Sequence, residues 1–323
     1  MVMTSRLTYI DIAKAIFMMI IVMDHTGCIE PFPLAFSVEV PAFMLLSGYF
    51  FSSKLPFLDF LKKKGRTLLI PFVVFYIFSY IIYYLCMWLY PPMSNMTAAS
   101  GVLDCFSQRQ YFNGPLWFLP CLFWSQVYMY GVEKYFPNVA VRGIIVGALG
   151  TLGFLLGKYG LFLPLSADIA LSLLPYLYCG ILLRKYDLFN RINIWTTIIA
   201  ILVTAVLCYH GGWVSQPSLN FWPSNLPMTW FVYIATIYCI TICCKYMGGG
   251  GKLLCYIGEK TLFIMCAHHL LYRPIKLVLS KFILDDFIMM LLLFTATMLM
   301  CCVLIPFVNK YMSWSVGKFD KPI

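Results

Sequence analysis

The fold is decided by one stretch near the start of the chain, Tyr9-Ile-Asp-Ile-Ala-Lys-Ala-Ile-Phe-Met-Met-Ile-Ile-Val-Met-Asp24-His25. It is apolar enough to form a membrane-spanning helix, yet it contains the ionisable residues Asp11, Lys14, Asp24 and His25. Such a group costs roughly 2.5–3.5 kcal/mol on insertion scales, so it usually faces the protein interior and has a function there. Lys14 and His25 are about three helical turns apart, on nearly the same face and ~16 Å apart along the axis. Asp11 points within ~40° of the His25 direction, so one stripe carries a carboxylate, an ammonium and an imidazole.

The composition indicates an integral membrane protein. The chain has 323 residues, of which 62% are hydrophobic and 11% charged, and its mean hydropathy is +0.84. Soluble domains are about 45–50% apolar and ~25% charged. The apolar runs are long enough to cross a ~30 Å hydrocarbon core as helices. Alternating strands of about ten residues, which are typical of outer-membrane barrels, are absent from the sequence.

The sequence predicts an all-α polytopic membrane protein with about ten transmembrane helices, forming a single domain over residues 1–323. The expected spans lie near residues 9–28, 36–53, 68–90, 114–132, 142–158, 166–183, 194–210, 227–245, 254–272 and 286–309. With a cytoplasmic N-terminus, 16 Lys and Arg residues fall on cytoplasmic loops and only 5 on the opposite side. Because cytoplasmic loops are enriched in basic residues, we expect a multi-pass protein of the cell inner (plasma) membrane with both termini inside.

Two expected external loops, near residues 91–113 and 211–226, are rich in Pro, Ser, Asn and aromatic residues. They either touch a polar acceptor or cap the helix bundle. The 13 Cys residues lie mostly inside apolar segments and show no metal-ligand spacing, so we expect neither a metal site nor a disulfide framework. The net charge of +10 is explained by the basic cytoplasmic loops, and no nucleic-acid partner is expected.

Titratable residues reach a similar depth from three expected helices. His25 lies ~22–27 Å from the cytoplasmic face, in the outer half of the bilayer. Glu39 lies at or just before the start of the second span, because Pro41 suits the first turn of a helix. His268 and His269 are ~21 Å into the ninth span. A carboxylate beside an imidazole would orient it and raise its basicity, although each group could instead be an interhelical polar contact.

A basic cluster, Lys62-Lys-Lys-Gly-Arg66, opens the third expected span on the cytoplasmic side. Lys63 and Arg66 are three residues apart and therefore share a helical face that suits one anion. The cluster could bind the phosphates of a nucleotide-bearing donor, or it could simply contact anionic lipid and set the topology.

Several short motifs, taken in order, resemble those of the acyltransferase-3 family of integral membrane acyltransferases, in particular its sugar O-acetyltransferase branch. These motifs are Asp11, Lys14 and His25; Val38-Glu39-Val-Pro-Ala-Phe-Met-Leu-Leu-Ser47-Gly48-Tyr49; Lys63-Lys-Gly-Arg66; Asn113-Gly-Pro-Leu-Trp117-Phe-Leu; and Gly258, Thr261 and His268. The resemblance covers nearly all of residues 1–310. It implies an acyl-CoA donor, most simply acetyl-CoA, on the cytoplasmic side. It also implies an acceptor hydroxyl on a cell-surface polysaccharide, glycolipid or cell-wall sugar.

Acyl transfer from a thioester to a hydroxyl needs a general base, a role that histidine fills most often. We therefore expect His25 to be the base and Glu39 to orient it, with His268 and Trp117 at the acceptor site. The remaining expected site residues would bind the coenzyme A phosphates or position the donor, and they are Lys14, Lys63 and Arg66.

Two other functions remain open on the sequence alone. A non-enzymatic carrier could use the same buried charges to move a polar or acylated metabolite across the membrane. A structural membrane protein would leave the aligned intramembrane charges without an explanation.

Overall fold

The computed structural model describes residues 7–27, 38–89, 113–191, 215–247, 251–282 and 285–318, with short pieces at 106, 195, 197–199, 201–202 and 206. These residues form helices and no β-strand, so the all-α prediction is confirmed. Among them, six helices are long and apolar enough to cross a membrane: Phe57–Leu85, Val139–Lys158, Pro164–Lys185, Leu226–Tyr246, Thr261–Leu279 and Asp286–Tyr311. The total of ten spans, the single domain and the orientation stay predictions, and most of the expected span 194–210 lies outside the described residues.

The chain divides into two compact units. The first unit comprises Met1–Phe51, Pro175–Pro217 and Trp222–Thr261, and the second comprises Ser52–Leu174, Ser218–Phe221 and Leu262–Ile323. The first unit contains α1 (Thr8–Thr26), α2 (Glu39–Tyr49), the second half of α8 (Ala167–Lys185), α9 (Leu188–Arg191), α11 (Leu226–Tyr246) and α12 (Lys252–Glu259). The second unit contains α3 (Phe57–Lys64), η1 (Gly65–Leu69), α4 (Ile70–Leu89), η3 (Gly114–Trp117), α6 (Phe118–Tyr135), α7 (Val139–Lys158), η4 (Pro164–Ser166), the first half of α8, α13 (Thr261–Leu279), α14 (Asp286–Tyr311) and η7 (Ser313–Val316).

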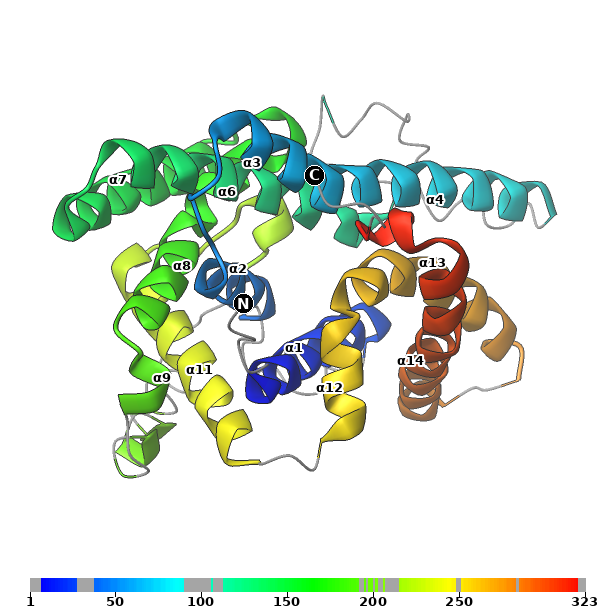
Figure 1. Cartoon of the computed structure of the whole chain (residues 1–323). Helices are drawn as coiled ribbons and strands as arrows, with labels where there is room; N and C mark the ends of the chain where they lie inside the picture. Colours follow the sequence, from blue (N-terminus) through cyan, green and yellow to red (C-terminus); the bar gives the residue numbers. More distant parts are fainter. Residues whose placement is uncertain are drawn as a thin grey trace. The chain divides into compact units, whose positions relative to one another are not determined.

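In the first unit, α1 packs along α12 and α11 (Figure 1). The closest approach is at Gly258 in α12, where an added Cβ would overlap the backbone carbonyl of Asp11. Small residues let helix backbones approach closely within a membrane. Gly258 is therefore a packing residue that holds α12 against the polar part of α1.

A reciprocal pair of glycines joins α2 to the second half of α8. A Cβ on Gly48 would overlap the carbonyl of Leu177, and a Cβ on Gly180 would overlap the carbonyl of Leu45. The two backbones thus touch at two points, which fixes the position of α2 in the first unit. Gly48 belongs to the Ser-Gly-Tyr motif of the second expected span, and this contact gives the motif a structural reason.

In the second unit, α3, η1 and α4 follow one another without a break in the helical backbone. The segment η1 is a π-helical turn, a feature that often occurs at functional sites. Arg66 is the second residue of this turn, and the backbone at Lys64 and Gly65 before it is right-handed helical. Gly317, with φ +74°, packs its backbone against Thr67 in this turn.

The ninth expected span, residues 254–272, is not one helix. The structure ends α12 at Glu259 and starts α13 at Thr261, with Lys260 in a non-helical conformation between them. The two helices belong mainly to different units. The depth expected for His268 assumed one continuous helix from residue 254. Because the structure has a break at Lys260, this assumption was wrong.

Part of the expected external loop near 211–226 is anchored inside the second unit. Asn220, which is 1% exposed, donates to the Gly153 carbonyl at 3.0 Å and to Asp168 Oδ2 at 3.1 Å. Ser172 donates to Asn220 Oδ1 at 2.7 Å. This buried network ties the residues Ser218–Phe221 to α7 and α8, as a capping loop requires.

Candidate functional site

The polar stripe of α1 begins with a partly buried ion pair. Asp11 is 7% exposed, and its Oδ1 lies 3.4 Å from Lys14 Nζ, one helical turn away. The Lys14 ammonium also lies over the ring of Phe50, 5.2 Å from its centroid. The carboxylate and the aromatic face both stabilise the ammonium inside the first unit. A donor-binding role for Lys14 stays a prediction.

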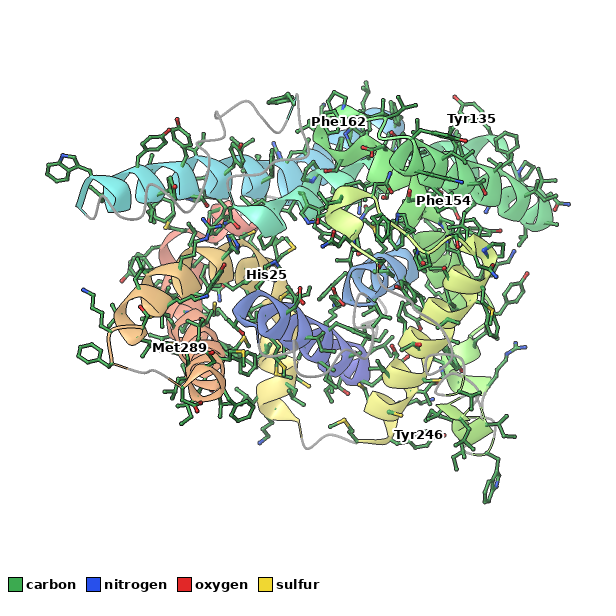
Figure 2. All side chains as sticks on the ribbon, turned by 180° about the vertical axis from the view of Figure 1, so that it is seen from behind. His25, Tyr135, Phe154, Phe162, Tyr246 and Met289 are labelled. Atoms are coloured by element: carbon green, nitrogen blue, oxygen red, sulfur yellow. The ribbon has the colours of Figure 1, made fainter. Side chains whose placement is uncertain are left out.

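His25 occupies the last turn of α1 (Figure 2) and is half-buried. Its Nδ1 lies 2.8 Å from the carbonyl oxygen of Ile21, one turn earlier. A carbonyl can only accept, so this contact places a proton on Nδ1 and leaves Nε2 as the basic nitrogen of the neutral ring. The helix then stops at Gly27, whose φ is +83°, a left-handed conformation that suits glycine.

Glu39 is the first residue of α2, as the position of Pro41 predicted. The residue is 8% exposed, and its Oε2 has no hydrogen-bond partner in the described part of the chain. The carboxylate of Asp24, next to His25 in the chain, acts on it electrostatically. Because Ile21 supplies the acceptor at His25 Nδ1, the orienting role expected of Glu39 stays a prediction.

In the second unit, Asn113 joins three segments. The sequence placed it at the start of the motif that leads to Trp117, but no role was predicted for it. It is 1% exposed, and its Nδ2 donates to Ser79 Oγ of α4 at 3.0 Å and to the Cys266 carbonyl of α13 at 2.9 Å. Among the described residues, nothing bonds to its buried Oδ1. These contacts fix the turn that leads into η3 and Trp117, which is 7% exposed. The only local signal was an Asn directly before Gly-Pro, and its partners are distant in sequence.

The histidine pair of α13 lies close to this turn. A Cβ on Gly114 would be 3.7 Å from the ring of His269. The His269 ring meets the Tyr272 ring edge to face, with 5.1 Å between the ring centroids. His268 is fully buried, and its Nδ1 lies 2.8 Å from the Ile264 carbonyl. This is the same arrangement as at His25, so it places the proton on Nδ1 by the same argument. The structure thus brings the motif around Trp117 and both histidines together in one unit.

The basic cluster lies at the start of the long helix of the second unit. Lys63 and Arg66 are both exposed, and the Lys63 carbonyl accepts from the Thr67 hydroxyl at 3.0 Å. Lys64, by contrast, turns onto the ring of Phe60, 5.6 Å from its centroid. Lys63 and Arg66 are therefore accessible to a dissolved anion, whereas their phosphate-binding role stays a prediction.

The described residues thus form two groups, one in each unit. Those of the first unit are Asp11, Lys14, His25 and Glu39, and those of the second are Lys63, Arg66, Asn113, Trp117 and His268. In the first group an ion pair joins Asp11 to Lys14. In the second group Asn113 bonds to the backbone of α13, the helix that carries His268.

No curated protein and no solved structure matches the chain. A family model does match, described as an acyltransferase domain of the acyltransferase-3 type, and the match covers residues 7–306. This interval contains every residue of both groups. The chain therefore belongs to the acyltransferase-3 family and is a multi-pass membrane acyltransferase.

Proposed function

We propose that this protein moves an acetyl group from acetyl-CoA to a hydroxyl of a sugar in a cell-surface polysaccharide or glycolipid, with His25 as the general base. Family membership gives the reaction class. The observation that carries the proposal is the contact of His25 Nδ1 with the Ile21 carbonyl at 2.8 Å. This contact supports a ring whose Nε2 is held ready to accept a proton, which a base in acyl transfer needs.

In the proposed reaction, Nε2 of His25 takes the proton of the acceptor hydroxyl while the hydroxyl oxygen attacks the thioester carbonyl carbon. The carbon–sulfur bond then breaks, and the thiolate of coenzyme A leaves with the proton that His25 had taken. The products are the sugar acetyl ester and free coenzyme A. The Glu39 carboxylate would stabilise the imidazolium formed on the way, as a buried carboxylate beside a histidine does in other acyl transfers.

The donor would reach the site from the cytoplasmic side, with its phosphates on Lys63 and Arg66. Two features support this assignment, namely the exposure of both side chains and the π-helical turn that presents Arg66. The Arg66 guanidinium can hold a phosphate with two parallel hydrogen bonds. Lys14 would act on the donor as a positioning residue, because it is paired with Asp11. His268 and Trp117 would contact the acceptor.

The test is incubation of the purified protein in nanodiscs with acetyl-CoA labelled in the acetyl group and with candidate membrane glycans, followed by mass spectrometry. We expect the label on a glycan hydroxyl, together with an equal amount of free coenzyme A. A carrier would instead move its cargo into sealed vesicles with the thioester intact. Transport without release of coenzyme A would therefore contradict the proposal.

A further inference from the structure

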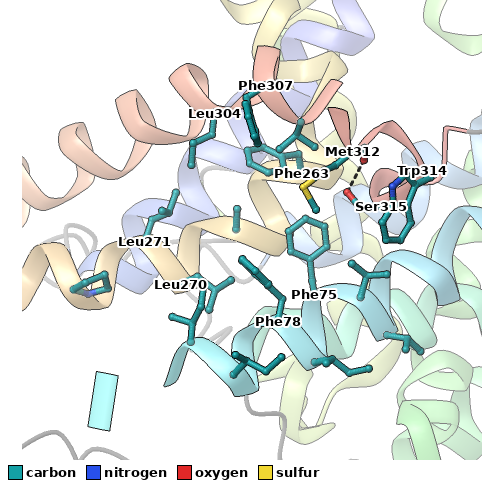
Figure 3. Close-up of a pocket in the computed structure, with 18 residues that line it drawn as sticks. Phe75, Phe78, Phe263, Leu270, Leu271, Leu304, Phe307, Met312, Trp314 and Ser315 are labelled. Atoms are coloured by element: carbon teal, nitrogen blue, oxygen red, sulfur yellow. Dashed lines mark hydrogen bonds between the residues drawn. The ribbon is translucent and has the colours of Figure 1, made fainter. Parts of the chain in front are cut away.

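The second unit contains an apolar groove of about 680 Å³ (Figure 3). Its walls come from α4, α13, α14 and η7, and they include Phe78, Phe263, Leu270 and Phe307. The Ser315 hydroxyl at its edge donates to the Met312 carbonyl at 2.7 Å. The volume lies within the range of roughly 300–1,000 Å³ typical of small-molecule sites. The chemistry of these walls suits an apolar ligand.

The groove follows a span that crosses the membrane. It runs along the face of α4 from Val73 to Ile82, a length of ~14 Å at 1.5 Å per residue. Three residues on this face, Val73, Ile77 and Ile81, are 48%, 50% and 57% exposed and are spaced one turn apart. An apolar site of this length beside a membrane span fits a hydrocarbon chain.

One end of the groove has the residues of a membrane–water interface. Trp314, which lines the groove, is 45% exposed. Lys310 lies over the ring of Tyr311 at 5.0 Å, and Lys318 donates to Asn309 Oδ1 at 2.9 Å. Exposed Trp and basic residues mark the depth of lipid headgroups. The two ammonium groups also give this end a positive charge, which favours an anionic headgroup.

We propose that the groove binds one acyl chain of an anionic phospholipid, with the headgroup phosphate held by Lys310 and Lys318. A phospholipid carries its phosphate a few bonds from its acyl chains, which suits two lysines that flank the groove-lining residues Met312, Trp314 and Ser315 in the chain. In an acyl-CoA, the long pantetheine arm separates the phosphates from the acyl chain, so the match is poorer. The lipid would hold α4, α13 and α14 together and thereby stabilise the folded second unit.

The test measures the binding of dioleoyl phosphatidylglycerol and dioleoyl phosphatidylcholine to the purified, delipidated full chain by native mass spectrometry. The two probes share their chains and differ in net charge. A lysine near a headgroup contributes about 1 kcal/mol, so two lysines should make the phosphatidylglycerol dissociation constant roughly 30-fold lower. The double variant Lys310→Ala/Lys318→Ala should lose this preference. A matched double variant at the exposed Lys134 and Lys252 should keep it.

A second pair of variants tests the groove itself. Ile77→Trp fills the groove at a residue that is already half exposed, and it should weaken the binding of both lipids. Leu152→Trp places the same side chain on α7, at a residue with 47% exposure, and should change neither. Equal binding of the two lipids by the wild type, or unchanged binding by Ile77→Trp, would overturn the proposal. If palmitoyl-CoA displaces phosphatidylglycerol from the wild type and its own binding is lost in Ile77→Trp, the groove binds the acyl donor. This result would also overturn the proposal.

Discussion

Replacing Gly258 by Ala tests the packing that holds α12 against the polar stripe of α1. The added Cβ would overlap the carbonyl oxygen of Asp11 and would lie 2.9 Å from its Cα. These are backbone atoms that cannot rotate away, so α12 must move. Overpacking of this kind costs typically 1–3 kcal/mol. The displaced helix would also disturb the ion pair of Asp11 and Lys14, so we expect acetyl transfer to fall with stability.

Gly147→Ala is the matched control, because nothing lies within 4 Å of a Cβ at that position in α7. The same substitution should there stabilise the protein by roughly 0.5–1 kcal/mol, since Ala favours a helix over Gly. The assay is the melting temperature of each variant in detergent, together with acetyl transfer at equal protein concentration. We expect a lower melting temperature for Gly258→Ala and an equal or higher one for Gly147→Ala. A Gly258→Ala protein that melts at the wild-type temperature would refute the close approach of α12 to Asp11.

Three further predictions concern the donor, the topology and the turn before η3. Arg66→Ala should weaken acetyl-CoA binding by roughly 1.5–3 kcal/mol in isothermal titration, which is the range for hydrogen bonds to charged groups. The control Arg191→Ala should leave the affinity unchanged. Unchanged affinity in Arg66→Ala would mean that the basic cluster only sets the membrane topology. In intact cells, an impermeant thiol reagent should label a Cys placed at Ser218 but not one placed at Asp187, and the reverse pattern would invert the orientation. Asn113→Ala should cost about 1–3 kcal/mol of stability, because its two buried partners lose their donor; wild-type thermal stability would argue against the clamp.

Hydropathy and helix-start signals were sufficient to predict much of the fold from the sequence. Except for the ninth span, the apolar runs located the long helices to within a few residues. Pro41 correctly placed Glu39 at the start of α2. The break at Lys260 was missed, although the polar segment Gly258-Glu-Lys-Thr261 interrupts the apolar run at this point. The π-helical turn at η1, where Gly317 packs on Thr67, was not predicted from the sequence either.

The candidate site was predictable in part, for a similar reason. Ionisable residues in an apolar helix are conspicuous, so Asp11, Lys14 and His25 were found directly. The acceptor for His25 Nδ1 is a backbone carbonyl of the same helix, whereas the sequence had suggested the Glu39 side chain. The role of Asn113 was not predicted, because its partners Ser79 and Cys266 are distant in sequence and only the folded second unit brings them to it.

The central claim is that His25 is the base, and the most direct measurement is the acetyl-transfer rate of His25→Ala. Loss of general-base assistance typically lowers a rate by roughly 10²–10⁴-fold. The neighbouring Thr26→Ala is the control, because its hydroxyl donates to the Val22 and Met23 carbonyls of its own helix. It removes a buried polar side chain from the same turn, and its rate should stay near the wild-type value. We predict the large loss for His25→Ala at an unchanged melting temperature. A well-folded His25→Ala protein that turns over near the wild-type rate would contradict the claim.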